Sequence, residues 1–206
     1  MIVYLESNFI LELAYLQEEY SNCERILELA RSGKAQLVLP AFAVAEPYSA
    51  WVGRKRRRGI LHGELTRELR ELGRSEPYAH SREEFQELTK ALLVSGEDEK
   101  RRLDQTIENV LQAAILIPIE ADTIRTAIDI QLTSLLGPQD SIVYASVLSH
   151  LASVNTGEPR CFVTKNSRDF ANPDIVAELT SYDCDLCTNF GEAYGWILSH
   201  KDTKGA

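Results

Sequence analysis

Short apolar runs alternate with longer stretches of helical periodicity along the chain. Each run is bounded by glycine, proline or polar residues and is too short for a helix, which is typical of a strand buried on both faces. Between the runs, apolar residues recur three or four positions apart, as on one face of a helix. The runs that we interpret as strands are residues 2–5, 36–40, 161–164 and 185–188. This alternation predicts an α/β fold with a mostly parallel sheet between layers of helices.

The predicted helices have recognisable starts and stops. Ser21 and Glu24 have the spacing of a capping box, which predicts the start of a helix. Pro47 lies inside another helix and is expected to remove a hydrogen bond and bend it. Gly137 and Pro138 end one helix, and Asp140 lies in the first turn of the next. The segments with helical spacing are residues 9–14, 23–30, 41–52, 124–135, 140–151 and 190–198.

Residues 53–116 are helical in pattern throughout. Interruptions are expected near residues 73–77 and at residues 95–96, where Ser and Gly meet. The apolar residues 115–119 then predict an extended connector. Because 206 residues suffice for one large domain but not for two with independent cores, we expect a single domain over residues 1–206 with a helical insertion or arm at about 53–116.

Charge is segregated within the chain, whose formal net charge is −9. Residues 54–74 contain eight basic and three acidic residues, so this stretch carries +5 and the remainder −14. Two interpretations of the stretch stay open: a solvated helical hairpin that covers the core, or an arm that binds the phosphates of RNA. The candidate phosphate contacts are Arg54, Lys55, Arg56, Arg57 and Arg58.

Other patterns exclude several classes of protein. No apolar stretch approaches the roughly 20 residues that cross a bilayer, and Met1 leads directly into a strand, so we expect a soluble cytoplasmic protein. Cys184 and Cys187 form a lone CxxC without the further ligands that zinc needs, so we interpret them as structural. GxSxG, Walker and GxGxxG motifs are absent from the sequence, which argues against serine hydrolysis and nucleotide binding.

Acidic residues occur where predicted strands give way to helices. Glu6 ends the first strand, Asp169 follows the strand over 161–164, and Asp140 lies on the same helical stripe as apolar residues of its helix. Glu46 could reach the same edge from the first turns of its helix. Because carboxyl ends of parallel strands meet at one edge of a sheet, we expect these four acids to converge. Buried carboxylates repel one another unless cations neutralise them, and oxygen ligands suit Mg²⁺ or Mn²⁺.

Four segments in order resemble the PIN-domain family of metal-dependent ribonucleases. The first is Val3 to Asn8, where Glu6 is followed by Ser7 and Asn8. The others are Val38 to Glu46, Pro138 to Ala145, and Phe162 to Phe170. The resemblance covers roughly residues 1–52 and 118–195 and leaves the helical middle outside the common pattern.

This resemblance implies a three-layer α/β/α domain with a short central parallel sheet and an acidic pocket that binds Mg²⁺ or Mn²⁺. The implied catalytic and metal-binding residues are Glu6, Glu46, Asp140 and Asp169, and the implied polar supports are Ser7, Asn8, Thr164 and Asn166. The implied activity is endonucleolytic cleavage of RNA by metal-activated water, as in the toxins of bacterial toxin–antitoxin pairs, with an antitoxin protein as partner. Exposed helix faces are compatible with a homodimer. The family typically has Asp where this chain has Glu6, whose extra methylene displaces the carboxylate.

Two other classes stay open beside this one. Hydrolases of phosphate esters and phosphotransfer receiver domains also place acids at strand ends, and Lys165 would be the lysine that a receiver needs. The third class is non-catalytic: a weakened PIN-like module that binds RNA or protein through its basic segment.

Overall fold

The computed structural model of the chain describes residues 1–134, 136–154 and 157–200. Within these ranges it forms a five-stranded sheet in the order β3-β2-β1-β4-β5, and every neighbouring pair is parallel. The strands are β1 (Ile2–Tyr4), β2 (Gln36–Pro40), β3 (Ala114–Ile117), β4 (Arg160–Val163) and β5 (Cys184–Cys187). The chain order therefore reverses direction beside β1, so the ends of β2, β1 and β4 lie next to one another in the middle of the sheet.

Alternate strand residues divide between two hydrophobic cores, one on each face of the sheet. Val3 and Leu37 pack on one face, whereas Tyr4 and Val38 pack on the other. The first face is covered by α1 (Ser7–Tyr15), α2 (Tyr20–Arg31), α9 (Phe190–His200) and the C-terminal part of α4 (Arg82–Leu111). The second face is covered by α6 (Pro138–Ser153), α7 (Ser167–Phe170) and α8 (Pro173–Ser181). The predicted three-layer α/β/α class is confirmed.

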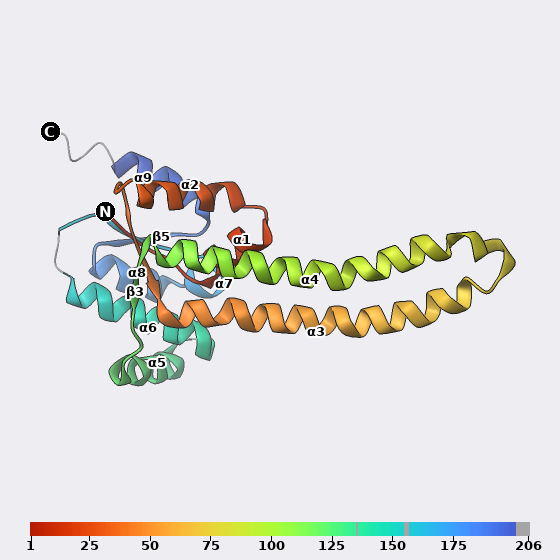
Figure 1. Cartoon of the computed structure of the whole chain (residues 1–206). Coiled ribbons are helices and arrows are strands. Elements are labelled where there is room, and N and C mark those ends of the chain that lie inside the picture. The colour runs from red at the N-terminus through yellow and green to blue at the C-terminus, as the bar shows by residue number, and fades with distance from the viewer. Residues whose placement is uncertain (135, 155–156, 201–206) are drawn as a thin grey trace.

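A long antiparallel hairpin of α3 (Ala41–Leu72) and α4 extends well beyond the sheet (Figure 1). The two helices are joined by the short 3₁₀ helix η1 (Glu76–Ser81). Both are rooted in the domain, because Ala43 and Leu103 are buried in the first core. The segment 53–116 is therefore not a separate unit: its first helix starts twelve residues earlier, at the end of β2, and its last residues form β3. In the described ranges, none of the helices, this long pair included, has the apolar length that a bilayer crossing requires.

Two local predictions in this region are wrong. The expected break at residues 95–96 does not occur, because α4 is continuous from Arg82 to Leu111. Gly96 is buried within the helix, and its carbonyl accepts a hydrogen bond of 3.0 Å from Trp51 Nε1 on α3. This contact links the two helices of the hairpin at the position where a turn was expected. Residues 115–119 are also more than a connector, since Ala114–Ile117 pairs with β2 as the edge strand β3.

The capping-box prediction at Ser21 is wrong as well. Helix α2 begins one residue earlier, at Tyr20, with Glu19 as the preceding residue and without a side-chain cap. The Glu19 carboxylate instead accepts hydrogen bonds from the backbone N–H groups of Phe190 and Gly191, at 2.6 and 3.0 Å. It thereby caps the first turn of α9, which a local sequence pattern could not reveal.

A core substitution tests the two-sided packing of the sheet. Phe162 on β4 is fully buried, and its ring meets that of Phe170 edge-on at a centroid distance of 5.2 Å. We expect Phe162→Ala to lower the free energy of unfolding by about 3–5 kcal/mol, because a large cavity remains. Urea denaturation measures this change in the free energy of unfolding. Leu132→Ala on α5 (Ala121–Thr133) is the control: its side chain is 80% exposed, so a change within about 0.5 kcal/mol is expected. Equal effects of the two substitutions would contradict the assignment of the core.

Candidate active site

Four acidic residues lie at the carboxyl edge of the sheet, next to the three central strands. Glu6 follows β1, Glu46 lies in the second turn of α3 after β2, and Asp169 lies in α7 after β4. Asp140 is in the first turn of α6. The parallel topology brings together strand ends that are far apart in the sequence, which is the arrangement that the sequence predicted for these residues.

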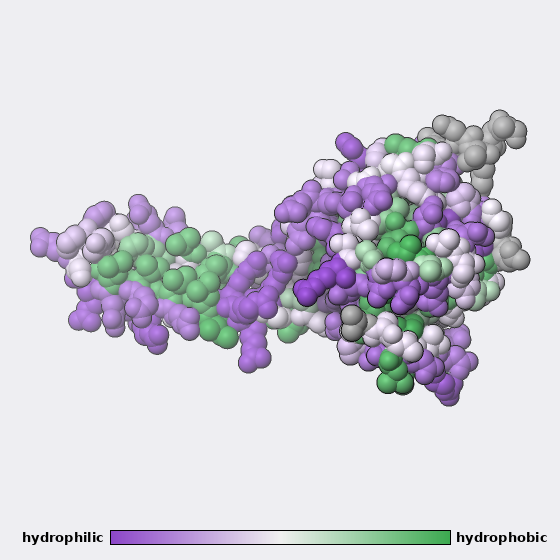
Figure 2. Space-filling model, turned by 180° about the vertical axis from the view of Figure 1, so that it is seen from behind, coloured by the Kyte–Doolittle hydropathy of each residue, from purple (hydrophilic) through white to green (hydrophobic). Residues whose placement is uncertain are grey.

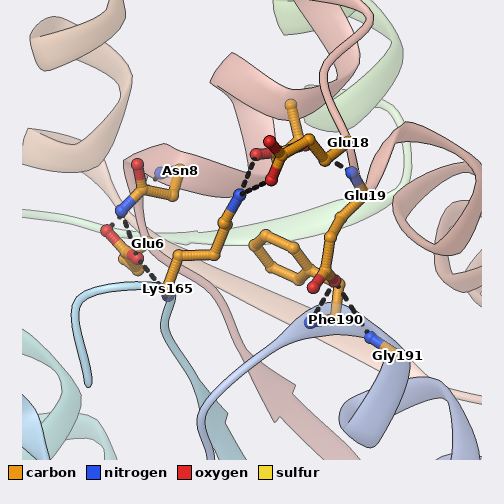
Figure 3. Close-up of polar contacts among 8 residues, drawn as sticks. Glu6, Asn8, Glu18, Glu19, Lys165, Phe190 and Gly191 are labelled. Atoms are coloured by element: carbon orange, nitrogen blue, oxygen red, sulfur yellow. Dashed lines mark hydrogen bonds and ion pairs between the residues drawn. The ribbon is translucent and has the colours of Figure 1, made fainter.

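Glu6 is the most tightly held of the four, with only 4% of its surface exposed. Its Oε1 accepts hydrogen bonds from Asn8 Nδ2 at 2.7 Å and from the Lys165 backbone N–H at 3.1 Å (Figure 3). A third hydrogen bond to Oε1 comes from Thr164 Oγ1 at 3.0 Å. Its Oε2 has only longer contacts, to Ser7 Oγ at 3.3 Å and the Asn8 N–H at 3.4 Å. Burial raises the pKa of Glu6, and the hydrogen bonds from Asn8, Lys165 and Thr164 oppose the rise. Oε1 is thus fixed by three hydrogen bonds, whereas Oε2 has only two long contacts.

Ser7 connects Glu6 to Glu46. The Ser7 hydroxyl lies 2.6 Å from Glu46 Oε2 and 3.3 Å from Glu6 Oε2. A hydroxyl has one hydrogen to donate, so the shorter contact takes it. Ser7 therefore holds Glu46 at the site by a hydrogen bond. Glu6 Oε2 receives no strong hydrogen bond from Ser7 and can accept one from another group.

Asn166 connects the other two acids. Its Nδ2 donates to Asp169 Oδ2 at 2.8 Å and to Asp140 Oδ2 at 3.3 Å. Its backbone N–H donates to Thr164 Oγ1 at 2.9 Å, and this same hydroxyl donates to Glu6. All four expected polar supports consequently touch at least one acid, and a continuous network links the two pairs.

Burial and electrostatic repulsion from the other three acids raise the pKa of Asp140. The pKa of Asp140 is raised to about 6, first by burial and then by repulsion from Glu6, Glu46 and Asp169. A raised pKa means that the ionised carboxylate is disfavoured at this position. The negative charge gathered here is therefore only partly compensated by the hydrogen-bond donors that surround it.

The donor set suits a hard divalent cation. All four candidate ligands are carboxylates, and Mg²⁺ and Mn²⁺ prefer oxygen. A cation would also relieve the repulsion that raises the pKa of Asp140. Within the described ranges, no three Asp, Glu, His or Cys side chains already stand close enough to hold an ion. The acids are instead tied in pairs by Ser7 and Asn166, so the chemistry fits an ion and the carboxylates would have to draw closer around it.

A fifth acidic residue, Glu12, lies beside the site and was not predicted from the sequence. Glu12 on α1 is 1% exposed, and its Oε1 lies 2.6 Å from Lys165 Nζ. Its Oε2 accepts a hydrogen bond from the Glu19 N–H at 2.8 Å. The one available signal was position: Glu12 lies three residues after Phe9, on the apolar side of its helix.

Lys165 joins this ion pair to the acidic site (Figure 3). Its backbone N–H holds Glu6, while its side chain turns toward α1, where the hydrogen bond to Glu12 raises the lysine pKa. In a receiver domain the ammonium group would have to face the acids. The observed direction therefore weighs against the receiver interpretation.

The basic run on α3 is largely committed to packing of the hairpin. Arg54 stacks over the Tyr15 ring at 4.1 Å, and Lys55 pairs with an exposed glutamate of α4 at 2.9 Å. Arg58 pairs with the buried Glu99 at 2.7 Å. Arg56 and Arg57 are exposed. Only part of the run thus remains available to a ligand, which revises the expectation that five basic side chains act together.

The cysteines have the character of core residues. Cys184 and Cys187 are buried at the two ends of β5, and all four cysteines are free thiols. Burial raises the pKa of Cys184 to about 12, so the reactive thiolate does not form near neutral pH. This agrees with a structural role for the CxxC.

Comparison with known proteins places the chain in a family. A solved structure with a similar arrangement, "Crystal structure of VapBC2 from Rickettsia felis bound to a DNA fragment from their promoter", is 14% identical. The alignment covers 90% of this chain and 97% of that chain, with a TM-score of 0.42. Among curated proteins, none matches the sequence significantly. The sequence model of the PIN domain matches residues 3–170, and this match runs through the hairpin that the motif resemblance left outside. Because it spans most of the 206 residues, the chain belongs to the PIN-domain family.

Proposed function

We propose that this protein is a Mg²⁺- or Mn²⁺-dependent endoribonuclease. The observation that carries the proposal is the hydrogen-bonded cluster of four acids at the sheet edge, in which Ser7 bridges Glu46 and Glu6 and Asn166 bridges Asp169 and Asp140. Acids gathered at the ligand-binding edge of a parallel sheet need a counter-charge, and a divalent ion supplies it. PIN domains are generally nucleases, which supports phosphodiester hydrolysis as the reaction.

The proposed roles follow from the hydrogen bonds. Glu6, Glu46, Asp140 and Asp169 would hold the metal, and the bound ion would activate water and stabilise the leaving oxygen of the phosphodiester. Thr164, Asn8 and the Lys165 N–H fix Glu6 Oε1, so that Oε2 is the oxygen offered to the site. Ser7 and Asn166 keep the acids in position before substrate arrives. Such preorganisation lowers the cost of assembling the site.

Glu6 is suited to its position despite the extra methylene. Its Oε1 reaches three donors, two of which come from the loop after β4. A shorter aspartate at the end of β1 would leave part of this donor set unfilled. We therefore propose that the site has adjusted to glutamate and has not decayed.

A second candidate function has one observation in its favour. In the described part of the chain, no three acidic side chains yet converge on one point. A weakened PIN-like module that binds RNA or protein without cleavage would have this property too. Cleavage assays separate the two functions directly.

We also propose that the protein acts as the toxin of a toxin–antitoxin pair, with an antitoxin protein as partner and homodimer formation through exposed helices. This rests on family resemblance alone. A neighbouring small open reading frame whose product copurifies with the chain would support it.

Replacing Asp140 tests catalysis. We expect Asp140→Asn to lower Mn²⁺-dependent cleavage of single-stranded RNA by about 100-fold or more, because it removes a ligand charge while it preserves shape. Gel analysis of a labelled RNA measures the rate. Asp129→Asn makes the same chemical change on the exposed face of α5 and should leave the rate unaltered. Equal rates for wild type and Asp140→Asn would favour the non-catalytic module.

The same variant should be more stable than wild type when metal is removed. Repulsion from Glu6, Glu46 and Asp169 disfavours the ionised Asp140 near neutral pH, and Asn carries no charge. Solvent screens the half-buried side chain, so we expect a gain of only about 1 kcal/mol, or about 2–4 °C in Tm. Added Mn²⁺ should raise the Tm of wild type more than that of Asp140→Asn. A larger metal-induced shift in the variant would contradict the assigned ligand role.

Glu6→Asp tests the fit of the longer side chain. We expect this variant to cleave RNA more slowly than wild type, because the shortened carboxylate cannot keep its bonds to both Thr164 and the Lys165 N–H. Relative kcat values at saturating Mn²⁺ measure the effect. Faster cleavage by Glu6→Asp would indicate that Glu6 is a weakened replacement for aspartate.

A further inference from the structure

A hollow of about 330 Å³ opens between the two helices of the hairpin, toward the end remote from the sheet. The residues that line it combine positive charge, hydroxyl and amide groups and an aromatic ring: Thr66, Arg70 and Arg74 from the α3 side, and Phe85, Gln86 and Thr89 from α4. Figure 2 shows apolar surface along this arm, bordered by hydrophilic side chains. The hollow is separate from the acidic site at the sheet.

The two arginines of the hollow are available to a ligand. Arg70 and Arg74 are exposed, and among the described residues neither enters an ion pair. Closer to the domain, Lys55 and Arg58 are paired with glutamates. Exposed arginines without an ion pair in the described ranges therefore occur near the base of the arm, at Arg56 and Arg57, and toward its tip, at Arg70 and Arg74.

Two further features point to a polar ligand with a flat ring. The Thr66 hydroxyl is buried and has no hydrogen-bond partner in the described part of the chain, although Thr66 lines the hollow. A buried hydroxyl without a partner is unfavourable, and a ligand group can satisfy it. Phe85 is half-buried in the same wall and offers a ring on which a base can stack.

A stripe of arginines connects the hollow with the base of the arm. Arg56, Arg67 and Arg70 are separated by eleven and three positions, which places them on one face of α3. All three are exposed, and Arg67 Nε lies 3.6 Å from Glu68 Oε1. Residues 54–74 thus offer positive charge to a long polyanion, whereas the rest of the chain, α4 included, carries a net charge of −14.

We propose that this hollow binds one nucleotide of single-stranded RNA, with Arg70 and Arg74 on the phosphate and Phe85 stacked on the base. Arginines supply the charge that phosphate contacts require, and aromatic stacking holds any base. The inference rests on the proposed ribonuclease function and extends it: the arm selects long, single-stranded substrates. Glu46 and Arg70 lie on the same helix 24 positions apart, or about 36 Å at the rise of an α-helix, so a short oligonucleotide cannot occupy both sites.

Binding of RNA without cleavage tests the proposal. Fluorescence anisotropy in EDTA, with a long labelled oligouridine and a labelled uridine trinucleotide, measures affinity over a range of salt concentrations. For the long RNA we expect Arg70→Gln/Arg74→Gln to reduce the slope of log K against log salt by about 1.4, which is two phosphate contacts on a single strand. Phe85→Leu should lower affinity about tenfold without changing that slope. In EDTA the acidic site repels RNA, so the trinucleotide can bind only at the hollow, and both variants should weaken its binding as well.

The matched control removes the same charge elsewhere. Arg101→Gln/Arg125→Gln changes two exposed arginines outside the hollow, on α4 and α5, and should leave the slope as in wild type. Circular dichroism of every variant checks that the helical content is retained. An unchanged slope in the pocket variant, or an equal reduction in the control, would overturn the proposal. The proposal would also be overturned if polyglutamate displaced the RNA and Phe85→Leu had no effect on RNA affinity. That combination would assign the hollow to an acidic protein segment.

Failure of this proposal and failure of the ribonuclease function are distinguishable. The anisotropy experiment contains no active metal and does not depend on cleavage. The Asp140→Asn experiment changes no residue of the arm. RNA that binds through the hollow but is never cleaved would therefore remove the enzymatic function alone.

Discussion

Repulsion among carboxylates is the constraint on which the site depends. The parallel sheet delivers Glu6, Glu46, Asp140 and Asp169 to one edge, and the raised pKa of Asp140 records the resulting conflict. Neutral hydrogen-bond donors from Ser7, Thr164 and Asn166 hold the acids in place without cancelling their charge. A site organised in this way can still bind a cation. Until a cation binds, the repulsion among the carboxylates lowers the stability of the folded protein.

Lys165 shows how closely the site and the core depend on each other. Its backbone N–H fixes Glu6, and its side chain forms an ion pair with Glu12, which is buried on α1. Breaking such a pair leaves an unpaired buried charge. The loop after β4 is consequently held from both sides, and Thr164 and Asn166 on that loop are positioned together with Lys165.

The hairpin separates two tasks that conflict electrostatically. Acids at the sheet edge suit a metal but repel RNA, whereas exposed arginines attract RNA and would neutralise the acids if they lay beside them. Arg58 and Lys55, which lie closer to the domain, are paired with glutamates of α4, and the exposed Arg70 and Arg74 lie toward the tip. Distance along one continuous helix keeps the two kinds of charge apart.

Local periodicity identified four of the five strands and the acids at their junctions with helices, because apolar spacing marks an element and a parallel sheet fixes where its strand ends meet. Glu6, Asp140 and Asp169 were identifiable on that basis. The edge strand β3 was missed, because its short apolar run resembles a connector until it pairs with β2. The pairing of side chains, by contrast, depends on how the layers of the fold pack together. The Gly96 carbonyl accepts a hydrogen bond from Trp51 within a continuous α4, Glu19 caps a distant helix, and Ser7 binds Glu46 in preference to Glu6. These contacts join residues far apart in the chain, and their partners depend on how the layers pack, which no local pattern encodes.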